Sequence, residues 1–246
     1  MITLKHFPLK KHIPNTLTCL NLACGCLSVI AALKGHLETA AILIIISSLF
    51  DFCDGLSARM LHVASPIGKE LDSLADVVSF GMAPAMISYT WLNRCLYEMS
   101  PLHNSPFMQL LPLIVLLVPA LSAVRLARFN IDENQKESFL GLPTPANALF
   151  LGFLPLTAEH IAFLNNFWAV WGFCIAFSLL LVSRIWMLSL KFKDFKWQGL
   201  NIARYILILI SVVLVVIFHW GAFPLIIMVY IIISLFYHAL VKLQII

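Results

Sequence analysis

Long apolar runs alternate with short polar segments along almost the whole chain. A helix needs roughly 20 apolar residues to cross the hydrocarbon core of a bilayer, and most of these runs have about that length. The pattern therefore predicts an all-α integral membrane protein with about eight transmembrane helices, and an even number places both termini on one side. The predicted spans are 14–34, 37–60, 70–90, 107–128, 143–160, 164–189, 201–219 and 222–241.

The distribution of Lys and Arg indicates which side the termini occupy, because cytoplasmic loops carry the excess of these residues. With a cytoplasmic N-terminus, fourteen of the 16 basic residues fall in inner segments and only Lys34 and Arg94 in outer ones. The sequence thus predicts a multi-pass protein of the cell inner (plasma) membrane with both termini cytoplasmic. The inner residues are Lys5, Lys10, Lys11, Arg59, Lys69, Arg125, Arg128, Lys136, Arg184, Lys191, Lys193, Lys196, Arg204 and Lys242.

The composition agrees with a membrane protein, since 61% of the residues are apolar, 11% are charged and the mean hydropathy is +0.94. We expect a single membrane domain over residues 1–246. The net charge of +4 comes mostly from the inner basic rim, which favours anionic lipid head groups and phosphorylated ligands. Without a soluble basic face, nucleic acid is not an expected partner. The six cysteines form no CxxC pair, so neither a thiolate metal site nor a disulfide is expected.

Four aspartates are the most informative polar residues. Asp51 and Asp54 end the second predicted span on its cytosolic side, and Asp72 and Asp76 open the third. A carboxylate this close to a bilayer is costly and usually marks a functional site. The spacings of three and four residues put both acids of each pair on one helical face. If the two helices face each other, all four carboxylates converge and require a cation.

Hard oxygen ligands of this kind select Mg²⁺, Mn²⁺ or Ca²⁺, and four acids can hold two divalent cations that clamp phosphate oxygens. Small residues on the same faces, Gly55, Ala58 and Gly68, leave room for a bulky phosphate ligand. Arg59 is placed to contact a phosphate. Structural ion pairs of the acids with Arg59 and Lys69 are the plainer alternative. The residues alone indicate metal-dependent diphosphate chemistry.

The segment DFCDGLSAR (51–59), followed by Gly68, Asp72 and Asp76, resembles the signature of the CDP-alcohol phosphotransferase family at every fixed position. Outside the signature the chain is similar to the phosphatidylserine synthase branch of that family. The similar segments are IPNTLTCLNLACG, DSLADVVSFGMAPA, AVRLARFN and GLPTPANA, between Ile13 and Ala148.

The resemblance implies transfer of a phosphatidyl group from CDP-diacylglycerol to the hydroxyl of L-serine, with release of CMP. It implies that Asp51, Asp54 and Asp72 are metal ligands, and that Asp76 is both a metal ligand and the general base. It assigns Gly55, Ala58 and Arg59 to the cytidine nucleotide and its phosphates. It further implies a homodimer, with a six-helix family core at about 14–189 and additional helices at 201–241.

Other polar residues allow two interpretations each. Arg125 and Arg128 could bind the serine carboxylate, or could be interfacial arginines that only set the topology. Asn15 and Thr18 could hydrogen-bond the nucleotide, although helix capping explains Asn15 equally well.

Asn21 and Asn147 are expected to satisfy interhelical hydrogen bonds. Among functions, an enzyme that accepts glycerol 3-phosphate or inositol phosphate stays open. So do a divalent-cation transporter and a catalytically silent scaffold.

Overall fold

The computed structural model describes residues 12–63, 65–99, 105–131, 139–190 and 196–242, and nearly all of them are helical. The inner residues Lys5, Lys10, Lys11, Lys136, Lys191 and Lys193 lie outside these ranges. The elements are α1 (His12–Leu33), α2 (Leu37–Met60), α3 (Pro66–Asp76), η2 (Val77–Met82), α4 (Ala83–Glu98), α5 (Pro106–Leu110), η4 (Leu111–Leu116), α6 (Leu117–Ile131), β1 (Phe139–Leu140), α7 (Thr144–Ala158), η5 (Ala162–Asn165), α8 (Phe167–Val182), β2 (Trp186–Met187), α9 (Leu200–Phe218), η6 (His219–Gly221) and α10 (Ala222–Lys242).

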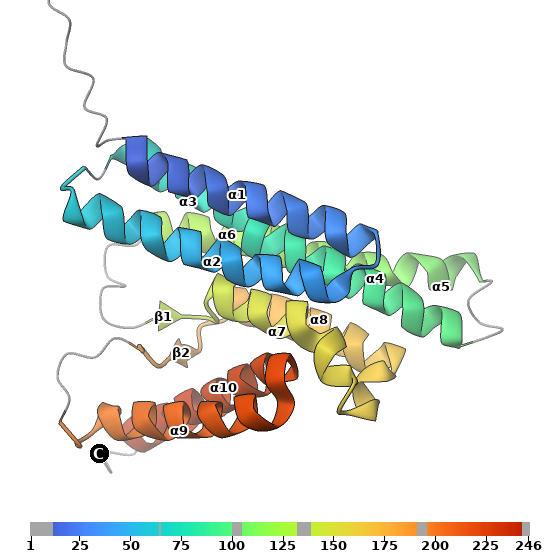
Figure 1. Ribbon diagram of the computed structural model, residues 1–246. Coiled ribbons are helices and arrows are strands. Elements are labelled where there is room, and N and C mark those ends of the chain that lie inside the picture. Colours follow the sequence, from blue (N-terminus) through green and yellow to red (C-terminus); the bar gives the residue numbers. More distant parts are fainter. Residues whose placement is uncertain (1–11, 64, 100–104, 132–138, 191–195, 243–246) are drawn as a thin grey trace, which may run out of the picture.

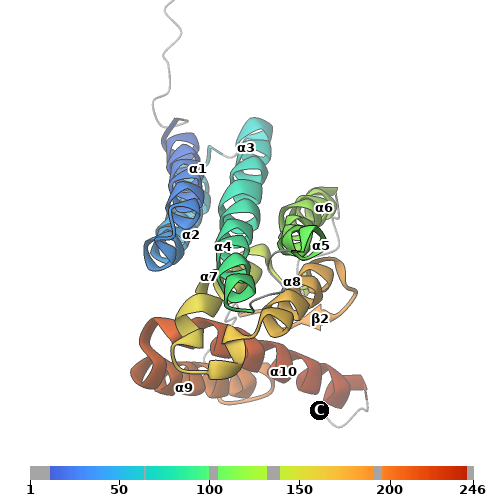
Figure 2. The same cartoon turned by 90° about the vertical axis from the view of Figure 1, so that its right-hand side faces the viewer.

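The helices form a bundle whose long members run along roughly one axis (Figure 1). α3, the π-helix η2 and α4 follow one another without a break, as do α5, the 3₁₀-helix η4 and α6. α1 packs on α2, and α7 packs between the α2–α4 side of the bundle and α10. Seen from the side, the α9–α10 hairpin closes one flank of the bundle (Figure 2).

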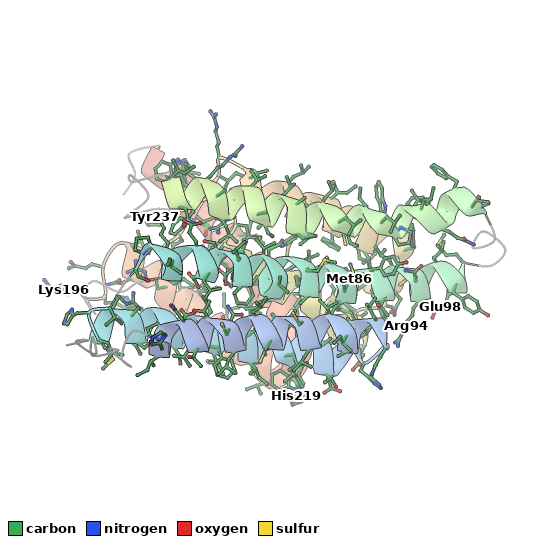
Figure 3. The ribbon with its side chains drawn as sticks, turned by 90° about the horizontal axis from the view of Figure 1, so that it is seen from above. Met86, Arg94, Glu98, Lys196, His219 and Tyr237 are labelled. Carbon is green, nitrogen blue, oxygen red and sulfur yellow. The ribbon has the colours of Figure 1, made fainter. Side chains whose placement is uncertain are left out.

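The two ends of the bundle carry different polar residues. At one end Arg94 Nη2 donates to the carbonyl of Gly35 over 2.9 Å, which joins two of the predicted outer segments. At the other end Lys69 Nζ donates to the carbonyl of Asn130 over 2.8 Å, which joins α3 to the end of α6. Figure 3 shows Arg94 and Glu98 at one end and Lys196 at the other. The sorting of basic residues along the sequence thus corresponds to a real sorting in space.

Four helical stretches are long and apolar enough to cross a membrane by length and composition: His12–Leu33, Leu37–Met60, Pro106–Ile131 and Leu200–Ala239. The last of these folds back at η6 to form the α9–α10 hairpin. Large apolar side chains are exposed on its outer surface, for example Val216 at 70% and Phe236 at 65%. Such a surface is stable only against lipid or another apolar partner. The chain is an all-helical, multi-pass integral membrane protein.

Hydropathy located most helix boundaries closely, and α2 has the predicted bounds of 37–60. The third helix begins earlier than expected because Ser65 caps it, accepting from the Gly68 amide over 3.0 Å, and Pro66 occupies its first turn.

The predicted helix 164–189 is wrong at its end. α8 stops at Val182, and Trp186–Met187 pairs with Phe139–Leu140 as a short antiparallel strand. Gly141, at φ +76°, allows this pairing because its backbone passes directly against the carbonyls that end α8.

Candidate active site

Three of the four signature aspartates converge where α2 meets the start of the third helix. One carboxylate oxygen each from Asp51, Asp72 and Asp76 can be chosen so that all three atoms lie within 4.8 Å of one another. The carboxyls of Asp51 and Asp72 are close enough to hydrogen-bond. Like charges at this separation repel strongly unless protons or a cation neutralise them. The three side chains could hold a metal ion.

The donor set fits a hard divalent cation. Asp72 Oδ1 is buried and has no hydrogen-bond partner within the described part of the chain, so a lone pair is left for a ligand. Asp76 is 8% exposed, which leaves little water to solvate its charge. Carboxylate oxygens alone, with no nitrogen or sulfur donor among them, favour Mg²⁺, Mn²⁺ or Ca²⁺ over softer metals.

Asp54 lines a cavity together with Asp72 of this cluster and is 4% exposed. Thr18 Oγ1 lies 2.5 Å from Asp54 Oδ2 and 3.1 Å from the Pro14 carbonyl, so the hydroxyl bridges α1 and α2. Asp54 interacts electrostatically with Asp72 across a shared cavity. Thr18 therefore holds one oxygen of Asp54, and the carboxyl's orientation is fixed by α1.

A cavity of about 220 Å³ opens beside Asp54 and Asp72. Gly55 borders open space, since a side-chain carbon built there would meet nothing within 4 Å. The cavity unites seven of the predicted nucleotide and metal residues on α1, α2 and α3, and Arg59, which is exposed, is not among its lining residues. The lining residues are Pro14, Asn15, Thr18, Asp54, Gly55, Ala58, Val63, Ser65, Gly68, Lys69 and Asp72.

Asn21 is a site residue whose role the sequence did not reveal. Its side chain is fully buried, and Nδ2 donates to Asp76 Oδ1 over 3.3 Å. Ser47 Oγ lies 2.5 Å from Asn21 Oδ1 and 2.8 Å from the Asn21 carbonyl. Because the Ser47 hydroxyl donates to Oδ1 of Asn21, the other end of the amide, Nδ2, must point toward Asp76. The only sequence signal was an Asn within an apolar span.

The π-helix η2 begins directly after Asp76 and packs on α1. Ser79 Oγ donates to the Asn21 carbonyl over 3.1 Å, so Asn21 ties α1 to both α2 and η2. Gly25 allows this contact, since a side-chain carbon there would lie 2.8 Å from Ser79 Cα. π-Helical turns are rare and occur frequently at functional sites. Here the contacts of Ser79 with Asn21 and Gly25 hold η2, and with it the adjoining Asp76, against α1.

Arg125 and Arg128 line a second cavity, of about 510 Å³, at the C-terminal end of α6. Arg184 also lines it, and none of its lining residues is acidic. Arg125 is partly buried, donates from Nη1 to Thr144 Oγ1 over 3.4 Å and interacts electrostatically with Asp76. Arg128 is exposed. Of the two arginines, Arg125 is the one that approaches the candidate base.

The site combines aspartates and small residues beside a cavity, and comparison with known sequences decides the family. The profile of the CDP-alcohol phosphatidyltransferase family matches residues 11–182. The chain belongs to the CDP-alcohol phosphatidyltransferase family. The matched region contains the four aspartates, Asn21, Arg125 and Arg128 but not Arg184, and it ends where α8 ends, before α9 and α10.

Relatives within this family have consistent names. The CDP-diacylglycerol–serine O-phosphatidyltransferase of Bacillus subtilis is 34% identical over 185 residues, which cover 75% of this chain and 92% of the relative. The enzyme of the same name from Helicobacter pylori strain J99 is 32% identical over 206 residues, covering 82% and 80%. The archaetidylserine synthase of Methanothermobacter thermautotrophicus is 34% identical over 180 residues, covering 70% and 68%.

Proposed function

We propose that this CDP-alcohol phosphatidyltransferase moves the phosphatidyl group of CDP-diacylglycerol to the hydroxyl of L-serine and releases CMP, with two divalent cations bound. One observation carries the proposal: Asp51, Asp72 and Asp76 converge beside a cavity bordered by Gly55 and open space. The names of the relatives, all of which specify serine or archaetidylserine chemistry, support serine as the acceptor.

We assign two roles to the residues around the acidic cluster: binding of the nucleotide and activation of the acceptor. On the nucleotide side, Gly55, Ala58 and Gly68 give the cytidine diphosphate close access to the helix backbone, and Asn15 and Thr18 provide hydrogen-bonding groups. Arg59 steadies the phosphates from outside the cavity. Asp51, Asp54, Asp72 and Asp76 would hold the cations, which neutralise the diphosphate and the charge that develops during phosphoryl transfer.

On the acceptor side, Asp76 takes the proton of the serine hydroxyl as the oxygen attacks the phosphorus that carries the diacylglycerol. A bond forms between the serine oxygen and this phosphorus, the phosphorus–oxygen bond to CMP breaks, and CMP leaves with the electron pair. Asn21 donates to Asp76 Oδ1 over 3.3 Å and so orients the carboxyl that would receive the proton. The Arg125 guanidinium, supported by Arg128, binds the serine carboxylate.

The fold supports a cytoplasmic site. We infer eight membrane crossings, formed by α1, α2, α3–η2–α4, α5–η4–α6, α7, α8, α9 and α10, with both termini and the acidic cluster on the cytoplasmic face of the inner membrane. α1 begins and α10 ends at the same end of the bundle (Figure 1). The orientation can be tested with two variants, Lys69→Cys and Arg94→Cys, each treated in intact cells with a thiol reagent that does not cross the membrane. Only the cysteine at position 94 should react.

A phosphorylated acceptor is the second candidate, because three arginines and no acid line the cavity at the C-terminal end of α6. The test is release of CMP from CDP-diacylglycerol by purified protein with L-serine, glycerol 3-phosphate or inositol phosphate, with and without chelator. Serine-dependent release that chelator abolishes and Asp76→Asn removes supports the proposal. Release with only a phosphorylated acceptor would replace it. Mass photometry of the same sample tests the homodimer that the family resemblance implies.

A further inference from the structure

Five buried side-chain atoms lack a hydrogen-bond partner within the described ranges: Asp72 Oδ1, Ser122 Oγ, Arg125 Nε and both polar atoms of Asn147. Leaving a buried polar group unpaired destabilises a protein, and native structures hold few such groups. The Asp72 atom belongs to the metal cluster. The remaining four come from two neighbouring regions, α6 and the first turns of α7, which indicates a second incomplete polar site.

Arg125 brings these atoms into one region. Ser122 and Arg125 are one turn apart on α6 and therefore share a face. Arg125 Nη1 donates to Thr144 Oγ1 on α7, and Asn147 follows Thr144 by one turn. The unpaired atoms of α6 and α7 thus belong to residues at, or one turn away from, the Arg125–Thr144 hydrogen bond between the two helices.

The direction of Asn147 follows from the contacts of its neighbours on α7. At about 100° per residue, Asn147 lies about 60° from Thr144 on one side and about 60° from Phe150 on the other. Thr144 contacts Arg125 of α6, and Phe150 stacks on Phe177 of α8 with a ring separation of 3.5 Å. Because α6 packs along α8, Asn147 lies on the face of α7 between its contact with α6 and its contact with α8. Its side chain is 0% exposed.

The same region adjoins the candidate base. Arg125 interacts electrostatically with Asp76. η2, which follows Asp76, packs tightly on α6, since a side-chain carbon at Gly81 would lie 3.3 Å from Ser122 Cβ. Arg125 and Ser122 thus link the unpaired atoms to the segment that carries Asp76.

We propose that Asn147 is a substrate-binding residue that hydrogen-bonds the carboxylate and ammonium groups of an amino-acid acceptor. This inference rests on the proposed function. The chemistry of the unpaired atoms fits a zwitterion. Arg125 Nε and Asn147 Nδ2 are donors and suit a carboxylate, whereas Asn147 Oδ1 and Ser122 Oγ accept hydrogen bonds and suit an ammonium group. A phosphate group accepts hydrogen bonds only, so the presence of an amide oxygen among the unpaired atoms suits the ammonium of an amino acid better than a phosphate.

The test uses Asn147→Leu, which keeps the volume of the side chain and removes its polar atoms. Without acceptor, the variant should be at least as thermally stable as wild type, because replacing an unpaired buried polar group by an apolar one is neutral or stabilising. L-serine should raise the melting temperature of the wild type and not that of the variant. The KM for serine should rise by about tenfold to a hundredfold, the usual effect of losing a hydrogen bond to a charged group. The KM for CDP-diacylglycerol should stay unchanged.

Discrimination between acceptors gives a second readout. Wild type should strongly prefer L-serine to 3-hydroxypropionate, which lacks the ammonium group, and Asn147→Leu should lose most of that preference. Asn147→Asp, which keeps an acceptor for the ammonium, should retain the preference while raising the KM. Thr157→Val is the matched control, since Thr157 is buried on the same helix and its hydroxyl bonds the Gly221 carbonyl over 2.9 Å. It should lower stability and leave both KM values unchanged.

The outcomes separate the two proposals. If wild type uses no serine, the proposed function fails. If wild type uses serine but Asn147→Leu is destabilised and keeps its serine KM and its acceptor preference, Asn147 has a purely structural role and this inference is overturned.

Discussion

The hydrogen bond from Asn21 to Asp76 gives the sharpest test of how the candidate base is positioned. In Asn21→Ala, Asp76 Oδ1 loses its donor, while Ser47 keeps an acceptor in the Asn21 carbonyl at 2.8 Å, so no hydroxyl is left unpaired. A hydrogen bond to a charged group contributes about 1.5–3 kcal/mol. The separation of 3.3 Å is long for such a bond and favours the lower value. About 1.5 kcal/mol corresponds to a roughly tenfold fall in kcat.

The assay is CMP release at saturating serine and CDP-diacylglycerol, together with Mn²⁺ binding followed by electron paramagnetic resonance. The expected result is a lower kcat with both KM values unchanged, because Asn21 contacts the base rather than the nucleotide cavity. Ser28→Ala is the matched control on the same helix, where a buried hydroxyl donates to the Ala40 carbonyl over 2.7 Å. It removes an interhelical bond of the same kind without touching Asp76. A folded Asn21→Ala protein with wild-type kcat, or an equal loss in Ser28→Ala, would refute the positioning argument.

Three further predictions concern the nucleotide cavity and the cluster. Gly55→Ala should be at least as stable as wild type, since the added carbon meets nothing within 4 Å and Ala exceeds Gly in helix propensity by about 1 kcal/mol. Gly55→Leu should raise the KM for CDP-diacylglycerol, measured by initial rates. A normal KM in Gly55→Leu would show that the nucleotide binds elsewhere. Thr18→Val removes the donor to Asp54 Oδ2 and should weaken nucleotide binding, measured by calorimetry with CDP, by about fivefold to tenfold. Asp72→Asn should weaken Mn²⁺ binding at least tenfold by electron paramagnetic resonance, whereas Glu159→Gln, an acid distant in sequence and outside the cluster, should not.

Hydropathy and the Lys and Arg distribution were enough to locate most helices, because a bilayer imposes a minimum length and a charge asymmetry that the sequence carries directly. The end of α8 is different. Leu188 and Leu190 extend the apolar run past Val182, but Gly141 brings another segment of backbone against the end of the helix, and the chain continues as a strand. That outcome depends on a contact between residues about 40 positions apart, which a local window does not contain.

The acids and small residues of the site could also be predicted, because their spacing alone places them on helix faces. The partners of these residues could not. Thr18 was one candidate for hydrogen-bonding the nucleotide, and no sequence pattern indicated that its hydroxyl lies 2.5 Å from an Asp54 oxygen. Asn21 was expected to join helices, and it does so through a bond to Asp76. A single polar residue in an apolar span has the same local pattern whether it bonds a backbone carbonyl or a catalytic carboxylate. Only the packing of α1 against both α2 and η2 distinguishes the two.

Asn147 and Asn21 illustrate this distinction within one fold. Both are fully buried asparagines in apolar helices, and the sequence predicts the same interhelical role for each. Asn21 has partners for both ends of its amide, as a structural or positioning residue should. Among the residues that the structure describes, Asn147 has a partner for neither, although an Asn this deeply buried destabilises the folded protein when it is unpaired. An apolar residue of the same size would be more stable at position 147, so the presence of Asn there is explained by a ligand that completes its hydrogen bonds.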